Sequence, residues 1–340
     1  MMQVRLKTPY LIFLGDVGDD GHAKTGRGIA VWRPELCAGQ MRLTGCEDDL
    51  GLPELDTAGA VDAGIGTVIV GIASTGGVLL DHWIPALCDL ARAGMDIAAG
   101  THAKLNDNND LAAAAKEGNA RLIDVRIPPH DIEVGDGRPR TGKRVLMVGT
   151  DCAVGKKYTA LALHRELESR GVKATFRATG QTGIMIAGEG IPMDAVVSDF
   201  LSGAAEALTP DNDDDHWDVI EGQGCIVHPG YAAVTVGLLH GSQPDAVVLC
   251  HDPTRDWMIG LEDQVAIPSI DDTIAAVLSA ARATSDSCVW AGISVNTSSF
   301  TPTDRADYLS RTADRYEVPC VDPIATGIGD IADFLTEHVK

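Results

Sequence analysis

The sequence predicts an α/β protein of two domains, each built around a parallel β-sheet. Short apolar runs that indicate buried strands alternate along the chain with segments whose apolar residues follow helical spacing. The chain has 340 residues, enough for two domains of ordinary size, and its 37 glycines suit tight turns between strands and helices. A stretch rich in proline, glycine and charge, residues 127–142, predicts a linker between a first domain, 1–126, and a second, 143–340.

The first domain shows the strand–helix alternation of a Rossmann-like fold. Strands are expected at Leu11–Leu14, Thr67–Val70, Met95–Ala98 and Arg121–Val125, and helices after Asp81 and at Leu111–Lys116. Two glycine-rich stretches, Gly15–Gly28 and Gly71–Gly77, each follow a strand and are predicted to close over a substrate or a partner subunit. Neither forms the Gly-x-Gly-x-x-Gly fingerprint of a dinucleotide site.

The second domain begins with a strand, a glycine-rich turn and a helix, the order that predicts a phosphate-binding loop of the P-loop NTPase type. Val145–Val148 is the strand, and Ala160, Leu163 and Leu167 lie at the spacing of one helix face. Such a loop directs backbone N–H groups, a helix N-terminus and a lysine ammonium at one anion. The residues predicted to hold the phosphates are Gly149, Thr150, Asp151, Cys152, Ala153, Val154, Gly155, Lys156, Lys157 and Tyr158.

This loop departs from the usual pattern at two points. Five residues separate Gly149 from Gly155, where the usual motif has four, and Lys157 stands where a Ser or Thr hydroxyl normally holds Mg²⁺. Thr159 carries a hydroxyl, but it lies two residues later, at a different angle around the helix. The loop is therefore suited to phosphate and poorly suited to Mg-nucleotide hydrolysis, and no metal is expected.

Polar side chains follow the strands of the second domain. Further strands are expected at Val172–Phe176, Asp218–Ile220, Ala246–Cys250, Cys288–Ile293 and Pro319–Val321. Ligands of open parallel sheets bind outside the carboxyl ends of the strands, so polar residues there are candidates for a site. They are Arg177, Gln181 and Thr182 after the second strand, Glu221, His228 and Tyr231 after the third, Arg255 after the fourth and Asn296 after the fifth.

Composition excludes several classes of partner. Asp and Glu number 49 against 27 Lys and Arg, a net charge of −22, which disfavours binding to nucleic acid or to an anionic membrane. No apolar run reaches the roughly 18–20 residues of a membrane span, and the N-terminus lacks the apolar length of a signal peptide. The eight cysteines form no Cys-x-x-Cys pair, which favours free thiols in a reducing cytoplasm. We expect small-molecule substrates and a homo-oligomer.

Two resemblances follow from these motifs. The loop spacing and the strand end Val-Ile-Glu221-Gly-Gln-Gly resemble dethiobiotin synthetase. The whole chain more closely resembles a family long described as a domain of unknown function and represented by D-glutamate N-acetyltransferase, in which a Rossmann-like domain precedes such a P-loop domain. The matching stretches are Gly149–Thr159, Arg177–Gly183, Asp194–Phe200, Ile220–Tyr231 and Ser294–Thr297. This resemblance implies acetyl-CoA as donor and a D-amino acid, D-glutamate first, as acceptor.

Acetyl transfer to an amine requires a base, a polarised thioester carbonyl and alignment of the two reactants. The candidate bases are Glu221, His228 and Asp199. The ordinary histidine pKa of about 6.5 suits proton transfer, although a surface-loop histidine fits the same residues. Glu221 is expected to enter the site from its strand end. Asp199 precedes a helical segment, where capping competes with catalysis.

A dicarboxylate acceptor requires cations or N–H donors. Arg177 offers a bidentate fork, with Gln181, Thr182 and Tyr231 as neutral partners, although pairing with a surface acid is the commoner fate of an arginine. The resemblance alone assigns Asn296 to the adenine ring of CoA, whose phosphates the loop can hold without a metal.

Other functions remain open. A Mg-ATP-dependent ligase or carboxylase like dethiobiotin synthetase explains the loop spacing and Glu221, but it leaves Lys157 unexplained. A non-catalytic nucleotide or CoA sensor explains phosphate binding, but it leaves the polar strand ends without a role. Cys152 offers a nucleophile for covalent catalysis, although its backbone N–H alone accounts for its place in the loop.

Overall fold

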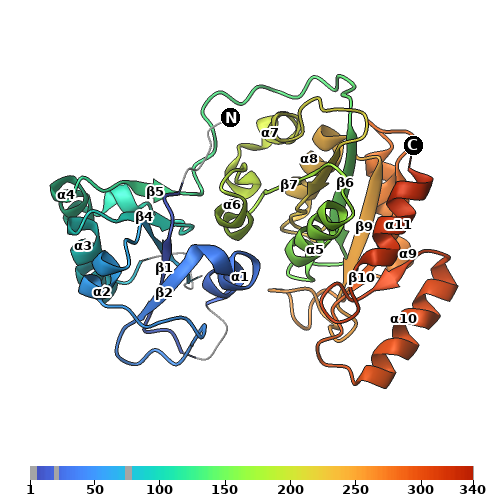
Figure 1. Ribbon diagram of the computed structural model, residues 1–340. Helices are drawn as coiled ribbons and strands as arrows, with labels where there is room; N and C mark the ends of the chain where they lie inside the picture. Colours follow the sequence, from blue (N-terminus) through green and yellow to red (C-terminus); the bar gives the residue numbers. More distant parts are fainter. Residues whose placement is uncertain (1–5, 19–22, 73–78, 340) are drawn as a thin grey trace. The chain divides into compact units, whose positions relative to one another are not determined.

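Figure 1 shows the computed structural model, which describes residues 6–18, 23–72 and 79–339. The chain divides into two compact units. The first comprises the chain up to Pro128 together with Gln181–Pro192, and the second comprises Pro129–Gly180 and Met193–Lys340. Parts of the predicted glycine-rich stretches Gly15–Gly28 and Gly71–Gly77, namely residues 19–22 and 73–78, lie outside the described residues.

The first unit is built on a five-stranded parallel sheet in the order β2-β1-β3-β4-β5. Its strands are β1 (Tyr10–Gly15), β2 (Cys37–Arg42), β3 (Thr67–Val70), β4 (Asp96–Ala99) and β5 (Leu122–Asp124), and its helices are α1 (Lys24–Trp32), α2 (Thr57–Asp62), α3 (Ile84–Arg92), α4 (Asn109–Glu117) and α6 (Gln181–Ala187). Strands β1 and β3 are buried along their whole length, with Ile12 paired to Ile69. The four strands predicted for this region are confirmed, and the order of the strands reverses between β1 and β3.

Strand β2 is the strand of this sheet that the sequence does not predict. Its sequence, Cys-Ala-Gly-Gln-Met-Arg, lacks an apolar run. It is the edge strand beside β1, and on its other side Gln40 forms an isolated parallel bridge with Glu54. Gln40 is buried there because its amide is satisfied: Nε2 donates to Asp49 at 2.9 Å and to Glu54 at 3.3 Å, and Oε1 accepts from the N–H of Leu50 at 2.9 Å. Hydrogen bonding thus compensates burial of a polar residue, which period-two hydrophobicity does not detect.

Helix α6 belongs to the first unit although it lies far along the chain. The Thr182 hydroxyl is 2.9 Å from that of Thr25, and Arg33 Nη1 donates to the carbonyl of Ile186 at 2.8 Å. Gly100 leaves room for Gln181, because a Cβ on Gly100 would lie 2.0 Å from its Oε1. The sequence predicts contiguous domains, whereas these contacts group residues 181–192 with the first sheet.

The second unit contains a six-stranded parallel sheet in the order β11-β10-β9-β6-β8-β7. The strands are β6 (Lys143–Gly149), β7 (Ala174–Arg177), β8 (Trp217–Ile220), β9 (Ala246–His251), β10 (Val289–Val295) and β11 (Cys320–Val321). All six predicted strands are confirmed. Strand β6 lies between β8 and β9, so the chain reverses its direction of travel across the sheet on either side of β6, and the loop after β6 lies at this switch point.

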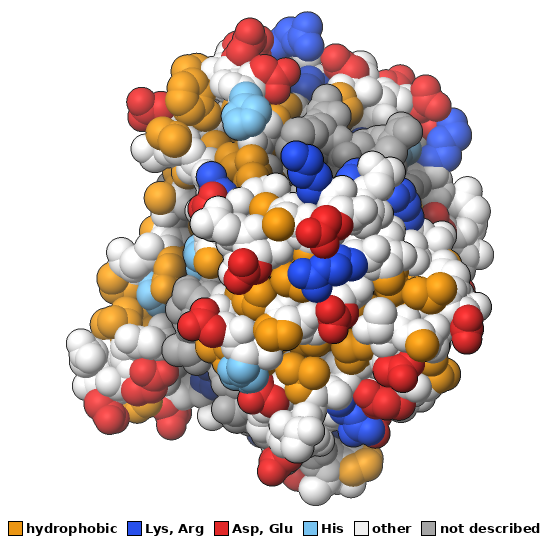
Figure 2. All heavy atoms as spheres, turned by 90° about the vertical axis from the view of Figure 1, so that its left-hand side faces the viewer, with side chains coloured by type: hydrophobic (Ala, Val, Ile, Leu, Met, Phe, Trp, Pro, Cys, Tyr) orange, Lys and Arg blue, Asp and Glu red, His pale blue; other side chains and the backbone are white. Residues whose placement is uncertain are grey.

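Helices cover both faces of the second sheet (Figure 1). Helices α5 (Lys156–Ser169) and α11 (Gly329–His338) pack on one face, while α7 (Leu201–Leu208), α8 (Ala232–Ser242) and α9 (Ile270–Ala281) pack on the other. The longest described helix, α10 (Pro302–Tyr316), contacts the edge strand β11. No helix in the described part of the chain is long and apolar enough to cross a membrane. On the face drawn in Figure 2, acidic side chains are spread widely, with Lys and Arg among them.

The predicted linker packs on the second unit from Pro129 onward. We call residues 129–142 the strap. Residues 127–142 form no helix or strand, yet the Glu206 carboxylate accepts from the N–H groups of Asp136 at 3.0 Å and Gly137 at 2.8 Å. Arg140 donates to the carbonyl of Gly241, in α8, at 2.6 Å. These bonds hold the segment against α7 and α8, where an unattached linker would have none.

Replacing Gly203 in α7 with alanine tests this packing. A Cβ at Gly203 would lie 1.8 Å from the carbonyl oxygen of Glu133 in the strap. Alanine ordinarily stabilises a helix by about 1 kcal/mol relative to glycine, but overpacking against a backbone atom costs about 1–3 kcal/mol. We expect a net loss of stability in urea unfolding. Gly59→Ala in α2, whose nearest neighbour would be Asp56 Oδ1 at 3.3 Å, is the control and should be near neutral. Equal stability of both variants would contradict the packing.

Candidate functional site

The loop after β6 and the first turn of α5 bring the predicted phosphate-binding residues into one turn. Gly149 ends β6, and Gly155 precedes α5 with φ of 105°, a conformation that favours glycine. Ala153 has φ of 54°. A Cβ on Gly149 would lie 2.7 Å from Val154 and 3.1 Å from the Lys156 ammonium, so only glycine lets the loop fold this closely over the strand end. The residues from Gly149 to Tyr158 therefore form the compact strand–loop–helix turn predicted from the sequence.

Lys156 supplies a buried positive charge to this turn. Lys156 is 6% exposed, and its Nζ donates to the carbonyl of Asp151 at 2.7 Å. Burial lowers the pKa of the Lys156 ammonium, because desolvation disfavours the charged form. Within the described part of the chain, no acceptor takes the backbone N–H groups of Gly155 and Lys156. These donors stand at the N-terminus of α5, the arrangement that binds phosphate groups.

Asp151 fixes the loop from within. Its carboxylate is fully buried and accepts from the N–H of Cys152 at 2.6 Å and the N–H of Ile259 at 2.8 Å, and it forms an ion pair with Arg255. Arg255 also donates through Nη1 to the carbonyl of Cys152 at 2.9 Å. From the sequence, Arg255 is expected only to follow a strand end, with no assigned role. The structure shows that it joins the segment after β9 to the phosphate-binding loop.

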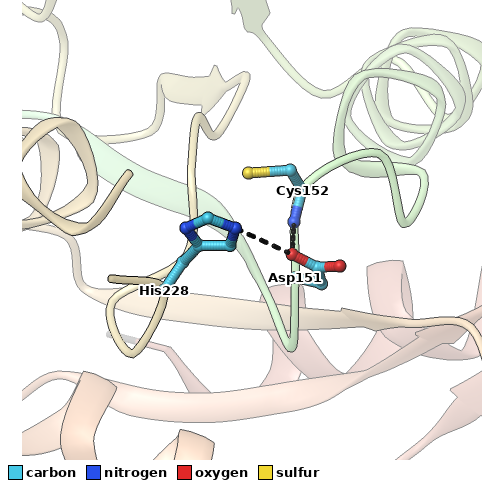
Figure 3. Close-up of side chains that lie close together, drawn as sticks. All are labelled: Asp151, Cys152 and His228. Carbon is cyan, nitrogen blue, oxygen red and sulfur yellow. Dashed lines mark hydrogen bonds and ion pairs between the residues drawn. The ribbon is translucent and has the colours of Figure 1, made fainter. Parts of the chain in front are cut away.

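Asp151, Cys152 and His228 lie together beside the loop (Figure 3), with one donor atom of each within 4.8 Å of the others. His228 is 3% exposed, so the surface-loop alternative is wrong. Its Nδ1 accepts from the N–H of Gly230 at 3.0 Å, which leaves the proton of the neutral ring on Nε2. Nε2 lies 3.3 Å from the carbonyl of Ile259 and 4.0 Å from Asp151 Oδ1.

The hydrogen bonds of His228 bear on whether this cluster can bind a metal ion or supply a nucleophile. A metal ion at Nε2 would require the proton there to leave and the Gly230 bond to be rearranged, because neutral imidazole offers one lone pair. Burial raises the pKa of the Cys152 thiol, which lowers its thiolate fraction and its nucleophilicity at neutral pH. The cluster therefore suits a hydrogen-bonded support for the loop better than a metal site or a cysteine nucleophile.

Glu221 follows β8 and is 4% exposed. Its Oε2 accepts from the N–H groups of Thr179 at 2.9 Å and Gly180 at 3.0 Å, while the Thr179 hydroxyl donates to the Glu221 carbonyl at 2.7 Å. Burial raises the pKa of this carboxyl group, and the backbone bonds and the charge of Lys157 oppose that rise. Glu221 thus enters the carboxyl edge of the sheet as expected and holds the turn after β7.

Arg177, which the sequence suggests as a partner for a dicarboxylate acceptor, is instead paired with an aspartate of the sheet. Its Nε donates to the buried carboxylate of Asp218 at 2.8 Å, between strands β7 and β8. The pKa of Asp218 is raised by burial, and the arginine charge opposes the rise. If Arg177 turned away, the buried carboxylate of Asp218 would lose its ion-pair partner. Because that loss is costly, Arg177 is held at Asp218. A bidentate clamp on a dicarboxylate is not supported by this geometry.

The remaining predicted residues lie in four different places. Gln181 and Thr182 belong to α6 and pack within the first unit, as described above. Asp199 is exposed in the 3₁₀ helix Ser198–Phe200 and does not cap α7; among the described residues no hydrogen bond or ion pair joins it to the loop. Tyr231 is exposed and its ring lies 4.7 Å from that of His228. Asn296 donates to Asp252 at 3.1 Å at the ends of β10 and β9.

No hydroxyl replaces the missing magnesium ligand at the start of α5. Lys157 extends over the ring of Tyr158, with Nζ 4.7 Å from the ring centroid. Thr159 is buried, and its hydroxyl donates to the carbonyl of Gly155 at 3.1 Å and lies 2.7 Å from the hydroxyl of Ser294. The Thr159 side chain is thus held in the domain interior and does not replace the hydroxyl missing at position 157.

A parallel sheet with a phosphate-binding loop at its switch point, accompanied by a Rossmann-like unit, defines a two-domain P-loop α/β protein. Residues 133–332 match a domain of unknown function, the DUF1611 P-loop domain, and residues 37–128 match the Rossmann-like N-terminal domain of the same family. The chain belongs to the DUF1611 family. A DUF1611 family protein of Anabaena variabilis has a crystal structure that matches with a TM-score of 0.86 and 29% identity, covering 98% of this chain and 100% of that one.

Two curated relatives cover nearly the whole chain. A protein of Tritonibacter scottomollicae named D-glutamate N-acetyltransferase is 47% identical over 97% of this chain and 99% of its own length. A protein of Pseudoalteromonas with the same name is 43% identical over 96% of this chain and 98% of its own length. The similarity therefore extends across both units rather than being confined to the phosphate-binding loop.

The raised pKa of Glu221 leads to a pH-dependent prediction. A carboxyl group with a higher pKa in the folded than in the unfolded state binds its proton more tightly when folded, so stability falls as pH rises through that interval. Glu221→Gln removes the buried negative charge and keeps an oxygen for Thr179 and Gly180. We expect a higher unfolding midpoint than wild type at pH 8, and a difference that shrinks as pH falls toward the ordinary glutamate pKa.

The control for this measurement is Glu206→Gln. Glu206 also accepts from two backbone N–H groups, but it is only half-buried. Thermal unfolding of both variants between pH 5 and 8 should show the pH-dependent gain only for Glu221→Gln. A Glu221→Gln midpoint below wild type at pH 8 would contradict the burial account.

Proposed function

We propose that this protein is an N-acetyltransferase that moves an acetyl group from acetyl-CoA to the amine of a D-amino acid, with D-glutamate as the first candidate acceptor. The names of the two curated relatives support the reaction and the acceptor. The observation that carries the choice of donor is the phosphate-binding loop, in which a buried Lys156 and helix N–H donors occur without a hydroxyl at position 157.

The chemistry of CoA fits this loop. CoA carries a pyrophosphate and a ribose phosphate, which bind to backbone N–H groups, a helix N-terminus and a lysine without Mg²⁺. A nucleotide hydrolase or ligase additionally requires a metal to neutralise charge developing during phosphoryl transfer. The residue after the loop lysine, Lys157, offers a cation where those enzymes carry a metal-binding hydroxyl.

The length of CoA separates phosphate binding from acetyl transfer. From the pyrophosphate to the sulfur, the pantetheine arm spans about a dozen bonds, or ~15 Å when extended, at bond lengths of roughly 1.3–1.5 Å. If the loop holds the pyrophosphate, the thioester carbon lies well outside the loop. Groups bonded within the loop, such as Asp151 and Cys152, then serve binding, and His228, bonded to Gly230 and adjoining Ile259, serves the shape of the loop.

The alternative with a specific observation in its favour is a Mg-ATP-dependent ligase. Glu221 stands at the end of β8, where such an enzyme uses an acidic residue for its metal. Its Oε2 accepts from Thr179 and Gly180, and no bond from a described residue reaches its Oε1. The Thr159 hydroxyl, in contrast, is held in the interior by Gly155 and Ser294 and offers no oxygen to a metal at the start of α5. An acetyltransferase, which needs no metal at this position, explains the placement of Thr159 better than a Mg-ATP-dependent ligase does.

An assay for thiol release distinguishes the two functions. With acetyl-CoA, EDTA and a panel of D- and L-amino acids, we expect free CoA to appear with D-glutamate and to remain at background with L-glutamate. EDTA should have no effect, because the loop binds phosphate through N–H and ammonium donors. No thiol release across the panel, together with ATP hydrolysis that requires added Mg²⁺, would overturn the acetyltransferase in favour of the ligase.

Lys156→Ala tests the role of the loop in donor binding. Loss of a hydrogen bond to a charged group costs about 1.5–3 kcal/mol, which corresponds to a roughly 10- to 100-fold rise in the KM for acetyl-CoA. The KM for the amino acid should change little. The matched control is Lys173→Ala, an exposed lysine that precedes β7 and pairs with Asp213 and Asp215. An unchanged KM for acetyl-CoA in Lys156→Ala would remove the loop from donor binding.

A further inference from the structure

Two exposed apolar side chains lie beside the phosphate-binding loop of the second unit. Tyr231, which ends the segment between β8 and α8, is 56% exposed, and Ile259, in the segment after β9, is 41% exposed. A single exposed apolar side chain is common in proteins, so the significance of these two depends on what holds them in place. We call Tyr231 and Ile259 the apolar pair.

Both members of the apolar pair contact His228, which is buried beside the loop. The Tyr231 ring lies 4.7 Å from the His228 ring, and the carbonyl of Ile259 lies 3.3 Å from His228 Nε2. The N–H of Ile259 also donates to Asp151, within the loop, at 2.8 Å. Figure 3 shows the His228 ring next to Asp151. The apolar pair is therefore fixed next to the start of the loop, and all of these residues belong to the second unit.

The backbone that carries the apolar pair is held by hydrogen bonds and by burial. The N–H of His228 donates to the carbonyl of Cys225 at 3.0 Å, and the N–H of Tyr231 donates to the carbonyl of His228 at 3.3 Å. Ile259 follows Met258, which is 1% exposed and anchors its segment in the domain interior. A ligand that contacts such a preformed surface loses less affinity to ordering of the protein.

The order of the strands shows on which side of the loop the apolar pair lies. In the order β11-β10-β9-β6-β8-β7, strand β6 separates β8 from β9 and β10. Tyr231 follows β8, whereas Asn296, which the resemblance assigns to adenine, directly follows β10. The segment of Ile259 begins after β9 and reaches the β8 side at His228. The apolar pair thus lies away from the strand end that carries Asn296.

The chemistry of CoA provides an occupant for this surface. The pyrophosphate of CoA joins adenosine at one end and pantetheine at the other, so the two groups leave a phosphate-binding loop in different directions. Pantetheine carries two methyl groups on one carbon and several methylenes around its two amides, and much of its surface is therefore apolar. Such carbon groups suit an isoleucine side chain and the face of a phenol ring, which remove them from water.

We propose that Tyr231 and Ile259 bind the pantetheine arm of CoA beside the phosphate-binding loop. This inference rests on the proposed acetyltransferase function and deepens it by naming the residues that hold the part of the donor between its phosphates and its thioester. From the sequence, Tyr231 is expected to bind the acceptor, and the inference assigns it to the donor instead. Both residues position the donor and take no part in proton transfer.

Isothermal titration calorimetry of the full-length protein with CoA and with 3′-phospho-ADP tests this role. The second ligand carries the adenine and all the phosphates of CoA but lacks pantetheine. Apolar contact of roughly 40–80 Å² contributes a factor of about 5 to 30 in affinity. We expect Tyr231→Ala and Ile259→Ala each to weaken the binding of CoA by about that factor and to leave the affinity for 3′-phospho-ADP unchanged.

Two further variants serve as controls. Tyr231→Phe keeps the ring and should retain the wild-type affinity for CoA. Val134→Ala shortens an exposed aliphatic side chain of the strap and should bind both ligands as the wild type does. Because Tyr231 packs on His228 and Ile259 is bonded to Asp151, the affinity for 3′-phospho-ADP also reports whether the loop is intact in each variant.

The two ligands separate this inference from the proposed function. Equal losses of affinity for CoA and 3′-phospho-ADP would show that the apolar pair only supports the loop, and unchanged affinity of both alanine variants for CoA would show that it does not contact pantetheine. Either result would overturn the inference and leave the acetyltransferase standing. A change of mass in analytical ultracentrifugation, with unchanged affinity for CoA, would instead assign the pair to contact with a second copy of the chain. A wild type that binds neither ligand would overturn the proposed donor as well.

Discussion

The organisation of the second unit depends on holding a buried ammonium group at the N-terminus of a helix. Lys156 is nearly closed to water, the N-terminus of α5 carries partial positive charge, and Arg255 adds a further cation nearby. The carboxylate of Asp151 is committed to Arg255 and to backbone N–H groups. The loop is therefore locally positive within a chain of net charge −22, and a phosphate is the partner that this excess of donors suits.

In the proposed function, the loop that binds the phosphates lies apart from the place where the acetyl group is transferred. If the loop holds phosphates through N–H groups and Lys156, as proposed, it has no need of a metal, and a lysine at position 157 and a Thr159 hydroxyl directed at Ser294 agree with that proposal. Phosphate binding there also keeps the thioester of a bound CoA away from the loop, because the pantetheine arm is long. In the proposed acetyltransferase the loop, with Glu221 holding the turn after β7, serves donor binding.

The sequence predicts those features that depend on contiguous residues. Apolar runs identified every strand of the second sheet, and the spacing of the glycines and lysine located the loop. The partners of individual side chains are set by residues distant in the chain, and periodicity does not reveal them: Arg177 pairs with Asp218, and the buried Gln40 bonds to the segment after β2. Nε2 of His82 lies 2.8 Å from the carboxylate of Asp16, which is 66 positions away in the chain. A single aspartate after a strand gave no signal of that partner.

The central claim is that the loop recognises the phosphates of the acetyl donor. The most direct test compares the affinity of acetyl-CoA with that of S-acetylpantetheine, which shares the thioester and lacks the phosphates, for the wild type and for Lys156→Ala in the presence of EDTA. The account predicts that wild type binds acetyl-CoA much more tightly, and that Lys156→Ala loses most of this advantage while its affinity for S-acetylpantetheine stays the same. Equal losses for both ligands, or none for either, would contradict the account.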